Sequence, residues 1–231
     1  MNYVAIPVGN RYSLLMKLLN SLDPLESIGW QIIIGIDYPY DPTIEHVFKR
    51  RDPLLTIWNK SHYGIGWNHY RVMNYAFSKL KAETVCLLDA DLELLPDGVQ
   101  LLDWFTYRED FLGMSLLAPR FPVGYKPSKN NLVSCNFFSR FQLTCKADMW
   151  YSHIQPCWMR TGRWDEDFSD LTEVSGRKVV HPEMSRVRVN GTQNSQMLSM
   201  EQHALLLNGM EVYEASPVLC YKLSEAEAER R

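Results

Sequence analysis

The sequence predicts an α/β fold with a mostly parallel, Rossmann-like sheet flanked by helices. Over the first 110 residues, short aliphatic runs alternate with segments whose apolar residues recur at helical spacing. Such a strand–helix succession is typical of parallel sheets covered on both faces. Two of the strand-like runs lead directly into aspartates, Asp37 and Asp89. We therefore expect carboxylates at the carboxyl edge of the sheet, where ligands of open α/β sheets bind.

Local patterns define each element of the first half. Four short apolar runs predict buried strands. They cover residues 3–8, 31–37, 54–58 and 84–88. Four intervening segments predict helices. They cover residues 13–22, 43–50, 67–80 and 96–107. The clearest apolar stripe belongs to the third helix, at His69, Val72, Met73, Ala76, Phe77 and Leu80. Pro96 stands in the first turn of the fourth helix, where proline is favoured.

The pattern becomes irregular after residue 110. A strand is expected at residues 113–118, followed by a proline-containing loop, and a final helix is expected at residues 199–208. A charged tail at residues 225–231 is expected to fray. No linker or internal repeat interrupts the chain, so we expect a single domain over residues 1–224, with a first half at 1–110 and a second at 111–224.

Composition bounds the class of protein. The 231 residues include 46% hydrophobic ones, enough for one large globular core or two small ones. A net charge of -3 and a pI near 6.1 argue against a strongly basic nucleic-acid binder. The chain enters a strand at once, without a signal peptide or a long apolar span. Five cysteines without C-x-x-C spacing favour free thiols. We expect a soluble, cytoplasmic protein.

The strand ends carry the candidate chemistry. Asp89 and Asp91 are two residues apart, and a divalent cation with oxygen ligands would relieve their repulsion. Asp37 could accept a hydrogen bond from a base or a ribose hydroxyl, and Arg11 could stack on a base or pair with a phosphate. Each of these residues could equally be an ordinary loop residue. Their common edge favours a site.

Other site motifs are absent or ambiguous. No glycine fingerprint of a dehydrogenase follows the first strand, no P-loop occurs, and no nucleophile elbow stands out. His69 lies on the apolar stripe of its helix, so a satisfied core histidine is the alternative to a ligand contact. The polar stretch at residues 181–195 could fold over a diphosphate or could be a surface loop.

Three blocks occur in a fixed order over residues 60–205. The first is Asn68-His69-Tyr70-Arg71 followed by the run from Val85 through Asp89-Ala90-Asp91-Leu92-Glu93 to Pro96-Asp97. The second is Trp164-Asp165-Glu166-Asp167, and the third is His181-Pro182-Glu183-Met184-Ser185-Arg186. Together they resemble glycosyltransferase family 13, the group of N-acetylglucosaminyltransferase I and protein O-mannose N-acetylglucosaminyltransferase. Asn10-Arg11 and Asp37 agree more weakly.

The resemblance implies a GT-A fold and an inverting transfer of a sugar from a UDP-sugar, with Mn2+ or Mg2+, to a hydroxyl acceptor. It makes residues 1–110 the nucleotide-sugar-binding half and residues 111–224 the acceptor and catalytic half. It also implies a role for each matching residue. These are Asp91 for the metal, Asp89 for the donor sugar, Arg11, Asp37 and His69 around the uridine, Ser195 for the diphosphate, and Asp167 or Glu166 as general base. We prefer Asp167, because Trp-Asp-x-Asp matches one branch directly.

Two departures limit what the resemblance carries over. Ala90 replaces the middle acid of the family, which puts the choice of donor in doubt. We also expect no membrane anchor or stem like those of the Golgi enzymes, so their glycan acceptor does not transfer with the motifs.

Three rival functions remain open. A viral or bacterial glycosyltransferase acting on a hydroxymethylated base in DNA would fit the compact chain and basic clusters such as Lys49-Arg50-Arg51, but not the acidic pI. A sugar nucleotidyltransferase would need a glycine-rich triphosphate loop after the first strand, which is missing. A non-catalytic nucleotide-sugar-binding module would be favoured if Asp167 and Glu166 pointed away from the metal site.

Overall fold

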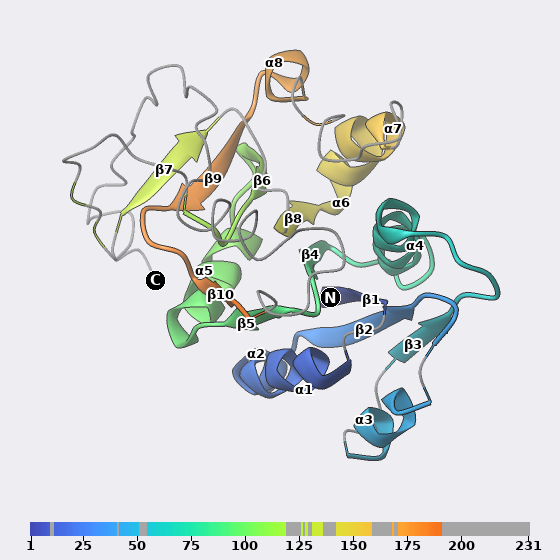
Figure 1. Ribbon diagram of the computed structural model, residues 1–231. Helices are drawn as coiled ribbons and strands as arrows, with labels where there is room; N and C mark the ends of the chain where they lie inside the picture. Colours follow the sequence, from blue (N-terminus) through green and yellow to red (C-terminus); the bar gives the residue numbers. More distant parts are fainter. Residues whose placement is uncertain are drawn as a thin grey trace, which may run out of the picture.

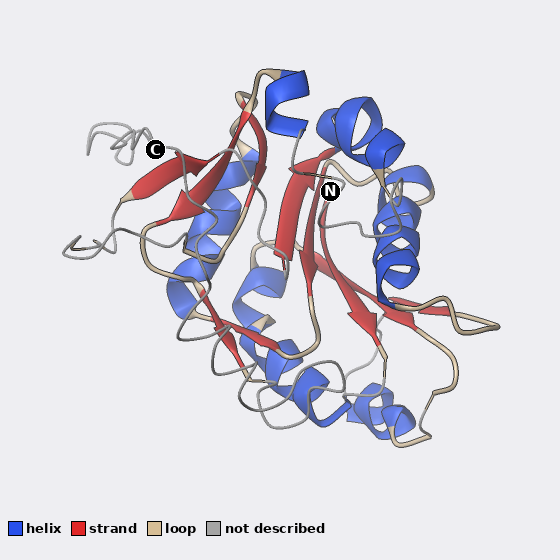
Figure 2. Cartoon of the chain, turned by 45° about the horizontal axis from the view of Figure 1, so that its top comes forward, coloured by secondary structure: helices blue, strands red, loops and turns tan. Residues whose placement is uncertain are grey.

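The computed structural model describes residues 1–9, 12–40, 42–50, 55–118, 126, 128, 131–135, 142–158, 168 and 171–190. Helices cover both faces of a large sheet (Figures 1 and 2). The first half follows the predicted order. Its elements are β1 (Asn2–Val8), α1 (Tyr12–Ser21), α2 (Asp23–Ser27), β2 (Gln31–Ile36), α3 (Ile44–Arg50), β3 (Leu55–Trp58), α4 (Ile65–Ser78), β4 (Thr84–Leu88), β5 (Leu92–Leu94) and α5 (Pro96–Thr106).

The second half of the described chain adds antiparallel strands and short helices. Its elements are β6 (Phe111–Met114), β7 (Leu132–Cys135), β8 (Gln142–Lys146), α6 (Ala147–Met149), the π-helical turn η1 (Trp150–Ile154), α7 (Gln155–Cys157), α8 (Leu171–Ser175), β9 (Lys178–Pro182) and β10 (Val187–Val189). The helix expected at 199–208 and the tail at 225–231 lie outside the described residues.

The main sheet has the strand order β3-β2-β1-β4-β8-β6-β9-β7. All pairs among β1, β2, β3 and β4 are parallel. The strand β8 pairs antiparallel with β4 and β6, and β7 pairs antiparallel with β9. The predicted α/β class is therefore confirmed: the four predicted strands form a parallel part of the sheet, and β6 also pairs in parallel with β9. A separate two-stranded ribbon joins β5 to β10.

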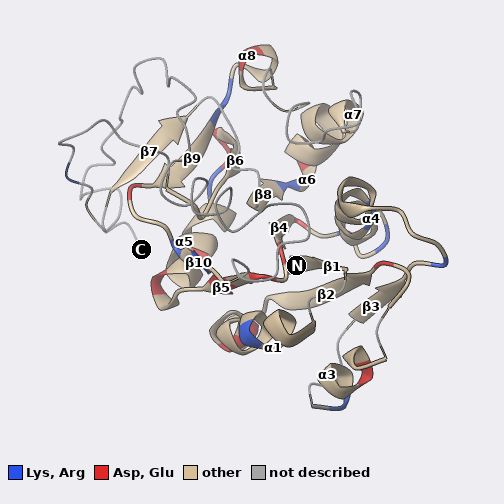
Figure 3. Ribbon diagram, viewed as in Figure 1, with Lys and Arg blue, Asp and Glu red and all other residues tan. Residues whose placement is uncertain are grey.

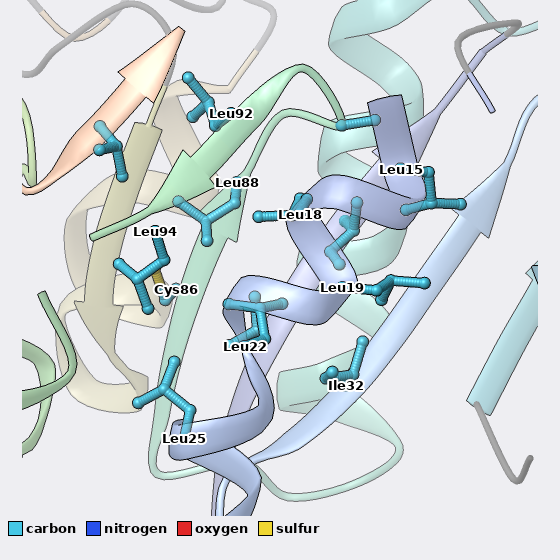
Figure 4. Packing of buried hydrophobic residues seen from close by; sticks show 14 of the residues in the cluster. Leu15, Leu18, Leu19, Leu22, Leu25, Ile32, Cys86, Leu88, Leu92 and Leu94 are labelled. Carbon is cyan, nitrogen blue, oxygen red and sulfur yellow. The ribbon is translucent and has the colours of Figure 1, made fainter. Parts of the chain in front are cut away.

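Alternate residues of the parallel strands face two different cores. In β1, Val4, Ile6 and Val8 belong to a cluster with α1, α2, α3 and α5, while Tyr3 and Ala5 belong to a cluster with α4, η1 and α8. Figure 4 shows leucines of α1 packed over β2, β4 and β5. The two-residue repeat of a strand sends successive side chains to opposite faces, so near-continuous apolar runs are what a doubly covered sheet requires.

An aromatic layer holds α4 against the second half. The rings of Phe77 and Trp150 stack with their centroids 5.3 Å apart, and those of Trp150 and Trp158 lie 5.5 Å apart. The indole of Trp158 donates to the carbonyl of Gly66 at 3.1 Å, in the first turn of α4. The second half therefore contacts α4 near both of its ends, at Phe77 and at Gly66.

The strand expected at residues 113–118 begins and ends earlier, at Phe111 and Met114. The amide of Ser115 still donates to the carbonyl of Val180, but beyond it side chains accept from the backbone donors and the ladder stops. The amide of Leu116 donates to Gln142 Oε1 at 2.6 Å, and the amide of Ala118 donates to Ser185 Oγ at 3.0 Å. Neither partner is near in sequence, so the local apolar pattern did not reveal the stop.

Burial keeps the core thiols unreactive. Of the four described cysteines, Cys86, Cys135 and Cys145 are buried and Cys157 is partly exposed. Burial raises the pKa of the Cys86 thiol to about 12 and also raises the pKa of Cys145. A thiolate is the nucleophilic form, so these two side chains serve packing rather than chemistry. None of the helices in the described ranges is long and apolar enough to cross a membrane.

Gly35 allows α4 to lie close to β2. A Cβ at this position would meet Asn68 Oδ1 at 3.1 Å and Val72 Cβ at 3.2 Å. We predict that Gly35→Ala lowers the free energy of unfolding by about 1–3 kcal/mol, because overpacking outweighs the gain of about 0.4–1 kcal/mol from a stiffer unfolded chain. Urea denaturation measures the change. Gly9→Ala is the matched control, since a Cβ there meets nothing within 4 Å; equal effects of both changes would contradict the prediction.

Candidate functional site

The carboxyl ends of four parallel strands meet at one edge. From β1 the chain crosses to β2 through α1 and α2 on one face, and from β3 it returns to β4 through α4 on the other (Figure 1). The strand order thus changes direction between β1 and β4. A topological switch point of this kind is where open α/β sheets bind ligands. The candidate residues of the sequence follow these strands.

Backbone pairing continues one residue beyond two of the strands. The amide of Asp37 donates to the carbonyl of Val8, and the amide of Asn59 donates to the carbonyl of Ile36, both at 2.9 Å. These bonds fix the first residue after β2 and after β3 relative to the neighbouring strand. Figure 3 shows acidic residues in red at the end of β2 and along β5.

The segment Asp89-Ala90-Asp91 forms a turn between β4 and β5. The amide of Leu92 donates to the carbonyl of Asp89 at 3.0 Å, and the carbonyl of Asp91 accepts from the amide of Asn190 at 2.7 Å. Asp89 and Asp91 are partly exposed, whereas the side chain of Ala90 is buried in the core cluster beneath the sheet edge. The turn therefore separates two accessible carboxylates by one core residue.

The side chain of His69 contacts the carboxylate of Asp89. The ring lies on α4 and is buried; its Nε2 lies 2.6 Å from Asp89 Oδ1, and its Nδ1 lies 2.6 Å from the carbonyl oxygen of Ile65. Both ring nitrogens thus face acceptors. Only the doubly protonated imidazole can donate to both at once. The geometry describes an imidazolium–carboxylate pair at the end of β4.

Burial and the neighbouring groups shift the pKa of His69 in opposite directions. Burial lowers the pKa of His69, but the Asp89 carboxylate, the Ile65 carbonyl and the Asp91 carboxylate together raise it above the ordinary value of 6.5. Because the pKa is raised in the folded state, protonated His69 stabilises the fold fully below about pH 6.5, and this contribution is lost as the pH rises through the higher folded-state pKa.

Asp37 is surrounded by donors of the protein itself. Its carboxylate accepts from Asn59 Nδ2 at 3.1 Å and from the amides of Tyr63 and Gly64 at 3.0 Å each, and His62 Nδ1 lies 2.9 Å from Oδ2. The side chain is 7% exposed. The amides of Tyr63 and Gly64 immediately precede α4, so the carboxylate also lies at the positive end of that helix dipole.

The block from His181 to Arg186 has an architectural role. Glu183 is buried, and its Oε2 accepts from the amide of Ser128 at 2.9 Å and from Asn131 Nδ2 at 3.2 Å. The guanidinium of Arg186 is also buried and lies 3.3 Å from Asp97 Oδ2 on α5. The carbonyl of Arg186 accepts from the amide of Leu95 at 2.8 Å. This block therefore connects the loop before β7, through Glu183, with α5 and the end of β5, through Arg186.

The structure brings four of the predicted residues to one edge: Asp37, His69, Asp89 and Asp91. The others, Arg11, Glu166, Asp167 and Ser195, lie outside the described residues. Sequence reasoning missed Asn59 and gave no role to Asn68, although Asn68 opens the first of the three blocks; the two side chains bond to each other at 3.0 Å beside Asp37. Asn59 directly follows a predicted strand, as Asp37 and Asp89 do, and this shared position was the available signal.

The carboxylate oxygens at the turn are ligands that suit a hard divalent cation. Within the described part of the chain, His, Cys, Asp and Glu side chains nowhere form a group of three that could hold a metal. Asp91 is half-buried at the turn and offers carboxylate oxygens, while Asp89 is engaged by His69. Magnesium-like ions are commonly held by one or two carboxylates together with substrate phosphates. The residues present therefore fit an ion shared with a bound diphosphate.

Replacing Asp89 tests the charge pair. We predict that Asp89→Asn lowers the pKa of His69, because the burial that disfavours the imidazolium stays while its main compensating charge is removed. NMR titration of the histidine ring protons without added metal measures this change. Asp110→Asn, at an exposed site before β6, is the matched control and should leave the titration of His69 unchanged. An unaltered pKa in Asp89→Asn would contradict the ion pair.

Comparisons with known proteins extend these observations. No family model and no curated protein matches the chain. Among solved structures, S. aureus TarS in complex with UDP-GlcNAc is similar with a TM-score of 0.58 and 14% identity, over 80% of this chain and 57% of that one. GalNAc-T7 with UDP, GalNAc and Mn2+ is similar with a TM-score of 0.60 and 13% identity, over 90% of this chain and 47% of that one. The chain thus spans about half the length of these proteins. Both likenesses confirm the GT-A fold expected from the sequence, while the resemblance to family 13 stays a prediction.

Proposed function

We propose that the chain is an inverting, metal-dependent glycosyltransferase that moves a sugar from a UDP-sugar to a hydroxyl acceptor. The observation that carries this proposal is the Asp89-Ala90-Asp91 turn at the switch point, with Asp89 paired to His69 and Asp91 left half-exposed. Carboxylates at this edge suit a cation and a diphosphate rather than a hydride carrier, and the dehydrogenase and P-loop fingerprints are missing from the sequence.

Asp91 is the proposed ligand of Mn2+ or Mg2+. The ion, when bound, supplies positive charge that neutralises the charge developing on the leaving diphosphate. Asp89, oriented by His69, faces the donor sugar and accepts hydrogen bonds from its hydroxyl groups. We assign Arg11 to the uridine and Ser195 to the diphosphate on the sequence pattern alone. For the buried His69, holding Asp89 replaces the direct uridine contact that the family resemblance implies.

The acceptor is activated by a carboxylate. Asp167, or alternatively Glu166, takes the proton of the acceptor hydroxyl as its oxygen attacks the anomeric carbon from the side opposite the leaving diphosphate. The C–O bond to the diphosphate breaks as the new glycosidic bond forms, so the configuration inverts. A base placed apart from the metal-binding turn is required, because attack and departure occur on opposite faces of the sugar.

Asp91→Asn tests the metal ligand. We predict that the variant loses the Mn2+-dependent part of UDP affinity and that transfer falls by roughly 100-fold, because the cation no longer has its protein anchor. Isothermal titration with UDP in the presence and absence of Mn2+ measures the first effect. Asp110→Asn is the control for charge removal. UDP affinity that stays Mn2+-dependent in Asp91→Asn would move the metal site elsewhere.

Asp167→Asn and Glu166→Gln form a matched pair for the base. We expect Asp167→Asn to lower kcat by about 10²–10⁴-fold, while the Kd for UDP stays unchanged because donor binding precedes proton removal. Glu166→Gln should retain most of the activity. The reverse result would assign the base to Glu166.

A donor and acceptor screen with Mn2+ tests the function as a whole. The donors are UDP-glucose, UDP-galactose, UDP-GlcNAc and UDP-GalNAc, the last two prompted by the ligands of TarS and GalNAc-T7. The acceptors are glycans, peptides and hydroxymethylated DNA. We expect sugar transfer from at least one donor, with loss of transfer when Mn2+ is chelated. Absence of both UDP release and UDP binding by the full chain would refute the proposal.

A further inference from the structure

The carboxylate of Asp37 has most of its acceptor capacity taken by donors of the protein itself. An ionised carboxylate offers about four lone-pair positions. The side chain of Asn59 and the amide of Tyr63 occupy Oδ1, and the amide of Gly64 occupies Oδ2. Nδ1 of the exposed His62 ring lies 2.9 Å from Oδ2 and also 2.9 Å from the carbonyl oxygen of Tyr38. A nucleobase N–H could reach Asp37 only by displacing one of these donors, and the side chain is almost fully buried.

The same donors join the carboxyl edge to α4. Asn59 also donates to Asn68 Oδ1 at 3.0 Å, and Asn68 Nδ2 donates to the carbonyl of Gly35 at 3.0 Å. These bonds connect the ends of β2 and β3, the segment of residues 59–64 and the first turn of α4. Removing Asp37 would therefore leave several of these donors unpaired at once.

The connection continues to the turn at the end of β4. Gly64 precedes Ile65, whose carbonyl accepts from His69 Nδ1, and the other ring nitrogen of His69 lies against Asp89. Continuous hydrogen bonding and one helix turn therefore link Asp37 to Asp89. The position of α4, which these bonds set, decides where His69 holds the Asp89 carboxylate.

We propose that Asp37 is a positioning residue of the donor site: it acts through residues 59–64 and α4, and it does not read the nucleobase. The inference rests on the proposed function. It departs from the uridine contact that the family resemblance implies for this position. Base selectivity must then come from other groups at the edge.

Uracil and cytosine separate the two roles. Uracil presents an N3–H donor, which a carboxylate can accept, whereas N3 of cytosine is an acceptor beside an amino donor. If Asp37 contacted the base, Asp37→Asn would exchange an acceptor for a group that also donates, and it would shift preference from UDP towards CDP. A positioning residue would weaken both nucleotides by the same factor.

The test measures UDP and CDP affinity by titration in Mn2+, with thermal unfolding recorded for every protein. Asp37→Asn and Asn59→Ala should each weaken UDP binding by about tenfold, with the UDP/CDP ratio unchanged within about twofold. The double variant should lose little more than the stronger single one, because both changes release the same segment. His62→Ala removes an exposed ring beside Asp37. It should weaken UDP and CDP binding by the same factor, and by less than Asp37→Asn does. His46→Ala, an exposed histidine of α3, is its matched control and should have no effect.

Each other outcome has a defined meaning. A UDP/CDP ratio that shifts in Asp37→Asn but not in Asn59→Ala assigns direct base contact to Asp37 and overturns the inference. A lower unfolding temperature with unchanged affinities makes the network purely structural and overturns it too. If Asp37→Asn does not fold, Asn59→Ala and His62→Ala decide by the same criteria, unchanged affinities in both overturning the inference. A wild-type protein that binds neither nucleotide refutes the proposed function itself.

Discussion

A buried carboxylate must be hydrogen-bonded or paired, and this requirement organises the carboxyl edge of the sheet. Asp37 is buried and meets it with three hydrogen-bond donors of the protein, while the partly exposed Asp89 is paired with the buried ring of His69. Satisfying both carboxylates fixes the segment before α4 and the rotation of α4 about its axis. The helix thus acts as a rigid link between the ends of β2 and β4.

The three residues of the Asp89-Ala90-Asp91 turn differ in burial, and their roles differ accordingly. Ala90 faces the core, so a carboxylate there would be taken out of water without a donor, at a cost of several kcal/mol. Asp89 is oriented by a buried partner, whereas Asp91 is held through its backbone carbonyl and the ribbon of β5 and β10. The side chain of Asp91 is half-exposed at this turn. A half-exposed carboxylate at this edge is within reach of a cation that arrives with a diphosphate.

The block from His181 to Arg186 shows how one sequence motif can serve architecture near a site. Glu183 and Arg186 are buried and bonded to distant loops and to α5. The tight approach of α5 to this block is visible at Gly98, where a Cβ would lie 3.0 Å from the carbonyl oxygen of Arg186. The ribbon that follows Asp91 therefore depends on packing against the second half, which joins the two halves around the proposed donor site.

The sequence by itself determined the four parallel strands, their covering helices and the carboxylates at strand ends, because apolar periodicity and strand termini are local properties. It also placed Asp37, Asp89 and Asp91 at one edge, whereas His69 entered the site only through the family resemblance. Only the tertiary structure decided which carboxylates are already engaged. Asn59 bonds Asp37 across 22 residues of sequence, and His69 bonds Asp89 across 20. Such bonds leave no local pattern, since the occupancy of a lone pair depends on where folding brings its donors.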